Sequence, residues 1–135
     1  MKAKITPKKK KTETLAKLKK KCDVAFSKYI RLRDADEGGT VQCCTCGVLR
    51  HWKDRIDCGH YISRTYLSLR YSDINCAPQC KGCNAWGGEK DKHALYLERT
   101  YGHGILQRLD EEKNKTVKFT KADYQEMIDR FTEAV

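Results

Sequence analysis

Two pairs of cysteines, each with two residues between its members, constrain the fold of this chain more than any other feature. They are Cys43 with Cys46 in the segment VQCCTCG, and Cys80 with Cys83 in QCKGCN. At this spacing a tight turn directs two thiolates toward one tetrahedral ion. The four cysteines are therefore predicted to bind one structural zinc ion that brings two distant parts of the chain together.

The alternatives for these cysteines are disulfides or a redox-active pair. The N-terminal segment lacks the apolar run and cleavage site of a secretory signal, and no segment reaches the roughly 20 apolar residues that span a bilayer. We therefore expect a cytoplasmic protein without a membrane partner, where metal ligands or free thiols are commoner than disulfides. Redox motifs of the thioredoxin type occur singly, which disfavours that alternative. Outside the two pairs, we interpret Cys44 as a packing or exposed thiol, and Cys58 and Cys76 as either small buried thiols or parts of a rearranged metal site.

Apolar periodicity and composition divide the 135 residues into four parts that we expect to form one domain. They are a basic tail expected to be disordered (1–11), an N-terminal helix (12–39), a Cys- and Gly-rich core (40–93) and C-terminal helices (94–135). Helical spacing marks the N-terminal part at Leu15, Leu18, Cys22, Phe26, Tyr29 and Ile30. Helices are also predicted from Asp91 to Tyr101 and from about Ile105 to Glu112.

The last predicted helix has the strongest local signal. Thr120 and Asp123 have the spacing of a capping box. One apolar stripe follows, formed by Tyr124, Met127, Ile128, Phe131 and Val135. The core, in contrast, has only short apolar runs, which is typical of a small unit organised by a metal. The predicted fold class is α+β, with a small zinc-stapled unit flanked by N- and C-terminal helices.

The formal net charge of +10 is concentrated near the N-terminus. Residues 1–21 contain ten lysines and one glutamate, a net charge of +9, whereas the remaining residues contain 18 basic and 17 acidic side chains, a net charge of +1. Such a tail is either a solvated arm or an arm that binds phosphates through Lys8, Lys9, Lys10 and Lys11 without reading sequence. Charge alone does not establish nucleic-acid binding.

An insertion separates the two cysteine pairs. A zinc ribbon places roughly 15 to 20 residues between its pairs, but here 33 residues separate Cys46 from Cys80. Residues 56–62 of this insertion are predicted to form a short strand that carries His60. One zinc ion bound by both Cys-x-x-Cys turns (the two knuckles) would hold these turns together, so the insertion between them must double back. This brings His60 near the amide of Asn84. A lone histidine is more often structural, but this context favours a general base.

These motifs resemble a known family of nucleases. The order Cys-x-x-Cys, a strand ending in Gly-His, an Asn, and then Cys-x-x-Cys-Asn is similar to the zinc-stapled ββα-metal nucleases (HNH, or His-Me finger), and QCKGCNAWGGEKDKH resembles the corresponding segment of phage endonuclease VII. The segments CTCG, DCGHYISR, LRYSDIN, PQCKGCN and YLERTYG more closely resemble the NinG (Rap) family of lambdoid phage recombination proteins. The resemblance implies a structure-specific endonuclease of the bacterial host cytoplasm that acts on Holliday junctions and D-loops.

Residue by residue, the resemblance implies that His60 is the general base, Asn84 a ligand of the catalytic ion, and Asn75 the residue that braces the histidine loop. Endonuclease VII has an aspartate immediately before the base, where this chain has Gly59. Asp57 is the expected replacement, since alternate residues of a strand share one face. It lies one pleat, about 6.6 Å, further from the expected metal, so we expect a bulge at Gly59 or a bridging water.

The expected reaction is hydrolysis of a phosphodiester with one Mg²⁺ or Mn²⁺ ion held by Asp57 and Asn84, and with neutral His60 accepting a proton from water. Further phosphate contacts are expected from Arg64, Arg70, Lys81, Lys90 and Lys92. His93 either joins the metal site or lies at a surface turn. Two symmetric nicks would favour a homodimer, and other phage recombination proteins are expected partners. The alternative function is a non-catalytic, zinc-stapled DNA-binding module that assists recombination.

Overall fold

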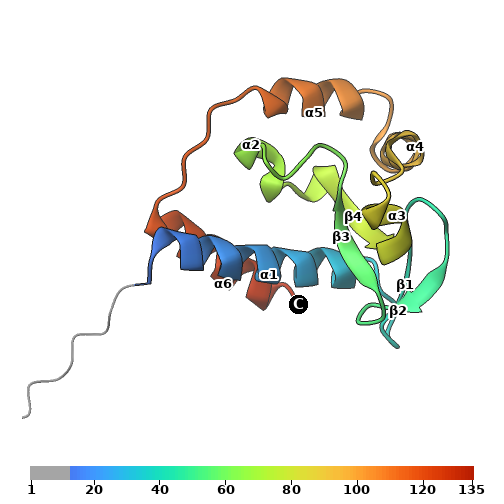
Figure 1. Ribbon diagram of the computed structural model, residues 1–135, viewed down its shortest axis with the longest axis horizontal. Helices are drawn as coiled ribbons and strands as arrows, with labels where there is room; N and C mark the ends of the chain where they lie inside the picture. Colours follow the sequence, from blue (N-terminus) through green and yellow to red (C-terminus); the bar gives the residue numbers. More distant parts are fainter. Residues whose placement is uncertain (1–12) are drawn as a thin grey trace, which may run out of the picture.

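A computed structural model describes residues 13–135, so the predicted basic tail with Lys8 to Lys11 lies outside the described residues. The fold is α+β, as the sequence predicts (Figure 1). Along the chain its elements are α1 (Leu15–Arg33), β1 (Thr40–Gln42), β2 (Leu49–His51), β3 (Ile56–His60), α2 (Leu67–Arg70), a 3-10 helix (Asp73–Asn75), β4 (Cys76–Cys80), α3 (Lys81–Ala85), α4 (Lys90–Tyr101), α5 (Ile105–Lys113) and α6 (Lys121–Glu133). No helix in this part of the chain is long and apolar enough to cross a membrane.

Helix α1 is shorter at both ends than the 12–39 segment predicted for it. It begins after Thr14, whose side chain accepts a hydrogen bond from the Lys17 N–H, and this cap fixes the first turn. It ends at Arg33, before a turn in which the Asp36 carboxylate accepts a hydrogen bond from the Thr40 N–H. Its buried stripe consists of Leu18, Cys22, Phe26 and Ile30. Leu15 is 46 % exposed and lies outside the stripe, contrary to the prediction.

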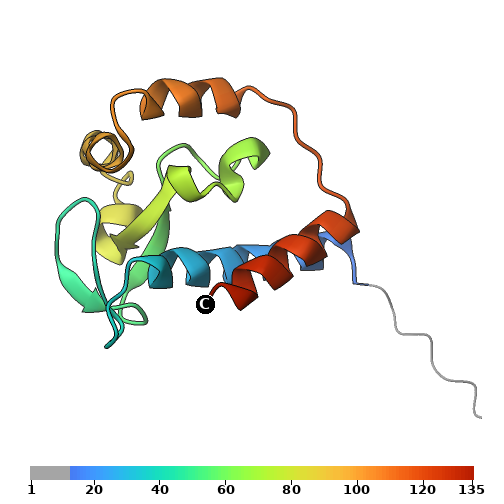
Figure 2. The ribbon, with the colours of Figure 1, turned by 180° about the vertical axis from the view of Figure 1, so that it is seen from behind.

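Helix α6 lies beside α1 and runs in roughly the same direction (Figures 1 and 2). The predicted capping box is present, because Thr120 and Asp123 exchange side-chain and backbone hydrogen bonds. The apolar stripe packs on α1 through Tyr124, Met127 and Phe131. Val135 is exposed because the helix stops at Glu133. Strands β3 and β4 pack against α1, and α6 packs on α1.

The central part of the chain consists of two antiparallel hairpins. Strand β1 pairs with β2, and β3 pairs with β4 in a register that joins Ile56 to Cys80 and His60 to Cys76. The strand predicted at 56–62 ends two residues early, at His60. The reason is that the backbone N–H and carbonyl of Ile62 form hydrogen bonds with the Asn75 side chain instead of with a neighbouring strand. Helix α3 follows β4 directly, so that β3, β4 and α3 make a compact β-β-α unit.

A second apolar cluster covers the other side of this unit. It contains Leu69 from α2, Leu97 from α4, and Ile105 and Leu109 from α5. Helix α4 starts after a turn in which Gly87 and Gly88 adopt positive φ angles of 75° and 78°, a conformation that favours glycine. The observed bounds of α4 and α5 agree with the predicted helices to within one residue. The two apolar clusters hold the β-β-α unit from opposite sides.

Candidate functional site

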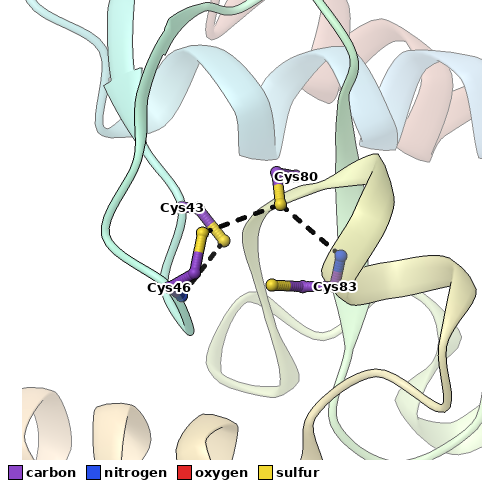
Figure 3. A group of neighbouring side chains, drawn as sticks. All are labelled: Cys43, Cys46, Cys80 and Cys83. Carbon is purple, nitrogen blue, oxygen red and sulfur yellow. Dashed lines mark hydrogen bonds between the residues drawn. The ribbon is translucent and has the colours of Figure 1, made fainter.

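The four paired cysteines converge on one point (Figure 3). Cys43 and Cys46 lie in the β1–β2 turn, whereas Cys80 ends β4 and Cys83 lies in α3. Their sulfur atoms are all within 4.8 Å of one another, and the Sγ atoms of Cys46 and Cys80 are 3.7 Å apart. Four sulfurs about 2.3 Å from a tetrahedral zinc would be separated by roughly 3.8 Å. The cluster therefore fits a structural zinc ion, and all eight cysteines are free of disulfides.

A backbone amide points to one sulfur atom in each Cys-x-x-Cys turn. The Cys46 N–H points to the Cys43 sulfur, and the Cys83 N–H points to the Cys80 sulfur, each at 3.5 Å. Burial alone would raise the pKa of the Cys43 thiol, but backbone N–H groups at residues 46 and 80 outweigh it and lower the pKa to about 6. A thiol that ionises near neutral pH is a ready zinc ligand.

Cys44 is not part of this cluster. Its side chain is half-buried, and its backbone N–H donates to the Pro78 carbonyl at 2.9 Å, which ties the first knuckle to β4. Burial raises the pKa of the Cys44 thiol to about 12. This neutral thiol matches the packing role expected from its position one residue after Cys43.

The second knuckle also places Asn84. Cys80 caps the N-terminus of α3, and Asn84 follows Cys83 in the first turns of that helix. The Asn84 amide donates to the Asp57 carboxylate of β3, with Nδ2 and Oδ2 3.1 Å apart. Lys81 approaches the other carboxylate oxygen, with its Nζ 3.5 Å from Oδ1. The side chains of Asp57 and Asn84 are thus in direct contact, as a shared ion would require.

The expected bulge at Gly59 is absent, so that prediction is wrong, whereas the alternative of a bridging water stays a prediction. Strand β3 pairs with β4 in continuous register, and Asp57 reaches Asn84 without a distortion of the strand. A Cβ atom at position 59 would lie 2.4 Å from Oε1 of Gln79. The buried Gln79 side chain occupies this space and donates to the Gly88 carbonyl at 2.8 Å. Glycine is present here because Gln79 leaves no room for a side chain.

His60 ends β3 with a defined ring orientation. Its Nε2 lies 2.9 Å from the Arg70 carbonyl, so Nε2 carries the proton and donates it to that oxygen. The neutral ring then has an unprotonated Nδ1 that can accept a proton. Burial lowers the pKa of His60 below its ordinary value, and the positive charges of Arg64 and Arg70 act in the same direction. A neutral imidazole at pH 7 is the state that a general base needs.

Asn75 holds the loop that follows His60. Its buried amide accepts from the Ile62 N–H at 2.9 Å and donates to the Ile62 carbonyl at 2.9 Å and to the Leu69 carbonyl at 3.3 Å. Its own carbonyl accepts from the Tyr61 N–H. Through these hydrogen bonds Asn75 braces the backbone on both sides of the loop.

A pocket of about 560 Å³ joins these groups. Residues from both faces of β3 line it, Asp57 from one and His60 from the other, and Asn84 completes the set from α3. Its basic lining residues are Arg64, Arg70 and Lys90. The pocket is large enough to admit a phosphate group beside a hydrated ion.

The basic residues predicted to contact phosphate differ in whether their side chains already contact other protein groups. Arg70 forms a two-point ion pair with Asp23 of α1 at 2.7 and 2.6 Å, which fixes the carbonyl that orients His60. Lys90 donates to the His60 carbonyl, and Lys81 faces Asp57. Arg64 is an exposed residue at the pocket. Lys92 is exposed but lies outside the pocket lining.

His93 is neither a surface residue nor a member of a metal cluster among the described residues. It is fully buried in α4, where its ring makes edge contacts with Tyr61 and Tyr96. Burial lowers the pKa of His93 to about 4. Neither ring nitrogen has a hydrogen-bond partner in this part of the chain. The neutral ring thus serves as a packing residue behind the loop that follows β3.

Sequence reasoning missed two residues of this region. Asp23 lines the pocket from α1, and no local signal links it to Arg70, which is 47 residues away in the chain. Trp86 ends α3 and is 83 % exposed, two residues after Asn84. An isolated tryptophan in a Gly-rich segment gives no indication from sequence whether it is buried or exposed.

Comparisons with known proteins give one match. The model of a protein family described as "NinG: Bacteriophage Lambda NinG protein" matches residues 1–135, the whole chain. No curated protein and no solved structure matches. The match extends across the four paired cysteines, the β-β-α unit and the helices that support it. The chain therefore belongs to the NinG family of bacteriophage proteins.

Proposed function

We propose that this protein is a metal-dependent DNA endonuclease that cuts branched recombination intermediates. Membership of the NinG family indicates a role in phage recombination. The observation that carries the nuclease proposal is the pocket in which an Asp57–Asn84 pair and the oriented imidazole of His60 meet. This combination of oxygen ligands and a neutral base on a zinc-stapled β-β-α unit resembles the ββα-metal nucleases.

The chain offers a hard cation two oxygen ligands. Asp57 supplies a carboxylate, and rotation of the Asn84 amide by a half turn would present its oxygen where its nitrogen now donates. Oxygen ligands of this kind suit Mg²⁺ or Mn²⁺. When bound there, the ion supplies Lewis-acid stabilisation of negative charge on the phosphate and leaving oxygen. Nδ1 of His60 accepts the proton of the attacking water, while the Arg70 carbonyl holds the ring in place.

Basic side chains around the pocket would hold the DNA backbone. Arg64 and Lys90 line the pocket and are available for a phosphate, and Lys81 faces the Asp57 carboxylate. Such contacts position a duplex without reading its sequence. Arg70 has a different proposed role, because its guanidinium is held by Asp23 and its carbonyl orients His60.

A four-way junction and a linear duplex of the same length test the proposed activity. With Mg²⁺ the protein is expected to cut the junction faster than the duplex, and with EDTA to bind the junction without cutting it. End-labelled strands on a denaturing gel measure the cuts. Paired nicks at symmetric positions would indicate that two copies act together. Cleavage of neither DNA with Mg²⁺ or Mn²⁺ would refute the nuclease proposal.

Removal of the oxygen ligands is expected to change the metal requirement. Asn84→Ala should reduce cleavage at low Mg²⁺ and recover part of it at higher Mg²⁺ or with Mn²⁺, because Asp57 still supplies a carboxylate. Asp57→Ala should reduce the cleavage rate further than Asn84→Ala does, since it removes the negatively charged ligand. Cleavage rates across a Mg²⁺ series measure both effects, with Asn114→Ala as the matched asparagine control. An unchanged Mg²⁺ dependence in both variants would exclude these residues as ligands.

Trp86 supports a preference for branched DNA. Its ring is exposed at the end of α3, two residues after Asn84, and can stack on an unpaired base at a branch point. Stacking contributes roughly 1 to 3 kcal/mol per base, so Trp86→Ala should weaken junction binding by about tenfold and duplex binding by much less. Fluorescence anisotropy with both DNAs measures this, with exposed Leu95→Ala as the control. Equal weakening for junction and duplex would show that Trp86 does not recognise branches.

The second candidate function is a zinc-stapled DNA-binding module without catalysis. The observation in its favour is that the Asp57 carboxylate has two protein partners, Asn84 and Lys81. Such a module would bind the junction equally with Mg²⁺ and with EDTA, and would leave every strand intact.

A further inference from the structure

We propose that Cys58, His60 and Cys76 form a second metal site, selective for a soft divalent cation such as Zn²⁺. One ligand atom from each residue lies within 4.8 Å of the other two. The β3–β4 register explains this, because His60 is paired with Cys76, and Cys58 lies two residues before His60 on the same face of β3. A zinc ion with these ligands would have sulfur and nitrogen atoms roughly 3.5 to 3.8 Å apart, so small side-chain rotations close the site.

The orientation of His60 matches that of a metal ligand. Metal-bound histidines usually donate the second ring N–H to a carbonyl or carboxylate, which fixes the ring. Here Nε2 donates to the Arg70 carbonyl at 2.9 Å, and Nδ1 remains for the ion. The Arg70–Asp23 ion pair holds that carbonyl in turn. The support for a bound ion is therefore already present.

The surroundings give the site an entrance and an open position. Cys58 and His60 line the pocket, whereas Cys76 is fully buried in the apolar cluster that includes Phe26. Three protein ligands with a fourth position open to water is an established arrangement for zinc. Two sulfurs and an imidazole favour soft cations, while the oxygens of Asp57 and Asn84 favour Mg²⁺. The two neighbouring sites would thus select different metals.

The second site would regulate the first, a consequence that rests on the proposed nuclease function. The same Nδ1 atom cannot bind a zinc ion and accept a proton from water. A cation held by Cys58 and Cys76 would therefore remove the general base while leaving Asp57 and Asn84 available. Zinc above the amount needed for the four-cysteine cluster should inhibit cleavage reversibly.

Cobalt binding tests the site independently of activity. Co²⁺ is added to zinc-loaded protein, the retained zinc is measured, and thiolate-to-cobalt charge-transfer absorption reports cysteine ligation. Wild type and the control Cys44→Ser, which removes a thiol outside both clusters, should bind one further cobalt ion per chain with this absorption. Cys58→Ser should bind it at least tenfold more weakly with reduced absorption, and thermal unfolding shows whether the variant is folded. Equal binding and absorption in wild type and Cys58→Ser would overturn the proposal.

Cleavage in excess Zn²⁺ then tests the regulatory consequence. Each protein is compared with its own rate before zinc is added, and Cys58→Ser should need at least tenfold more zinc for half-inhibition than wild type. Equal zinc sensitivity would overturn the regulation. If wild type does not cut DNA at all, the nuclease proposal fails, but the cobalt result still decides whether the metal site exists.

Discussion

Cys80→Ser is expected to unfold the β-β-α unit. Structural zinc contributes an apparent free energy of about 10 to 16 kcal/mol in small zinc-dependent units, which exceeds the stability of most domains of this size. Cys80 also caps α3, so its loss removes both a zinc ligand and the start of the helix that carries Asn84. Zinc content, near-UV circular dichroism and thermal unfolding measure the effect.

The wild-type protein should contain about one tightly held zinc per chain, because four thiolates complete a closed tetrahedral site. Cys43→Ser should behave like Cys80→Ser, whereas Cys44→Ser should retain its zinc and its fold. Wild-type protein from metal-replete cells that contains disulfides and no zinc would contradict this architecture. So would a Cys80→Ser variant with wild-type zinc content and thermal stability.

His60→Ala is expected to reduce Mg²⁺-dependent cleavage by roughly 10²- to 10⁴-fold, the usual contribution of a general base. Zinc content and junction binding should stay close to wild type, because His60 is in neither the four-cysteine cluster nor the exposed basic rim. The ring also packs near Phe26, with ring centroids 6.1 Å apart, so His60→Gln is the companion variant that fills more of the space. Exposed His103→Ala is the control. A wild-type rate in His60→Gln would exclude His60 as the base.

The pH dependence of cleavage gives His60 a second signature. The base acts only when neutral, so the rate should fall as pH drops through its pKa. Because burial and the charges of Arg64 and Arg70 lower that pKa, the acid limb should lie below the ordinary histidine value of about 6.5. The rate should therefore be on its plateau at pH 7. A rate still rising with pH between 7 and 8 would contradict this assignment.

Much of the fold could be predicted because its determinants are local. The two Cys-x-x-Cys knuckles place their own thiolates, and the Thr120–Asp123 box starts α6 at the predicted residue. The family resemblance also names Asp57 and Asn84 as ligands of one ion, and their side chains are in contact. The cysteine and capping-box predictions depend on a spacing of a few residues.

The remaining features depend on pairs of residues that are distant in sequence. Gln79 fills the space above Gly59 only because β3 and β4 pair in this register, so no bulge is needed there. Arg70 was predicted to contact phosphate, but Asp23 of α1 holds it. Cys58 and Cys76 belong to no Cys-x-x-Cys pair, and only the pairing of β3 with β4 places both beside His60. Such contacts depend on tertiary packing, and the periodicity of apolar residues along the chain does not predict them.

The most direct test of the central claim is a single-turnover cleavage experiment on a preformed complex. Zinc-loaded protein is bound to a labelled four-way junction without free divalent cations, and Mg²⁺ is then added to wild type and to His60→Gln. The account predicts that both complexes are stable and uncut before Mg²⁺, and that only the wild-type complex is then cut at a rate at least a hundredfold above the variant. Equal rates in the two complexes, or an uncut junction in the wild-type complex with Mg²⁺ or Mn²⁺, would contradict it.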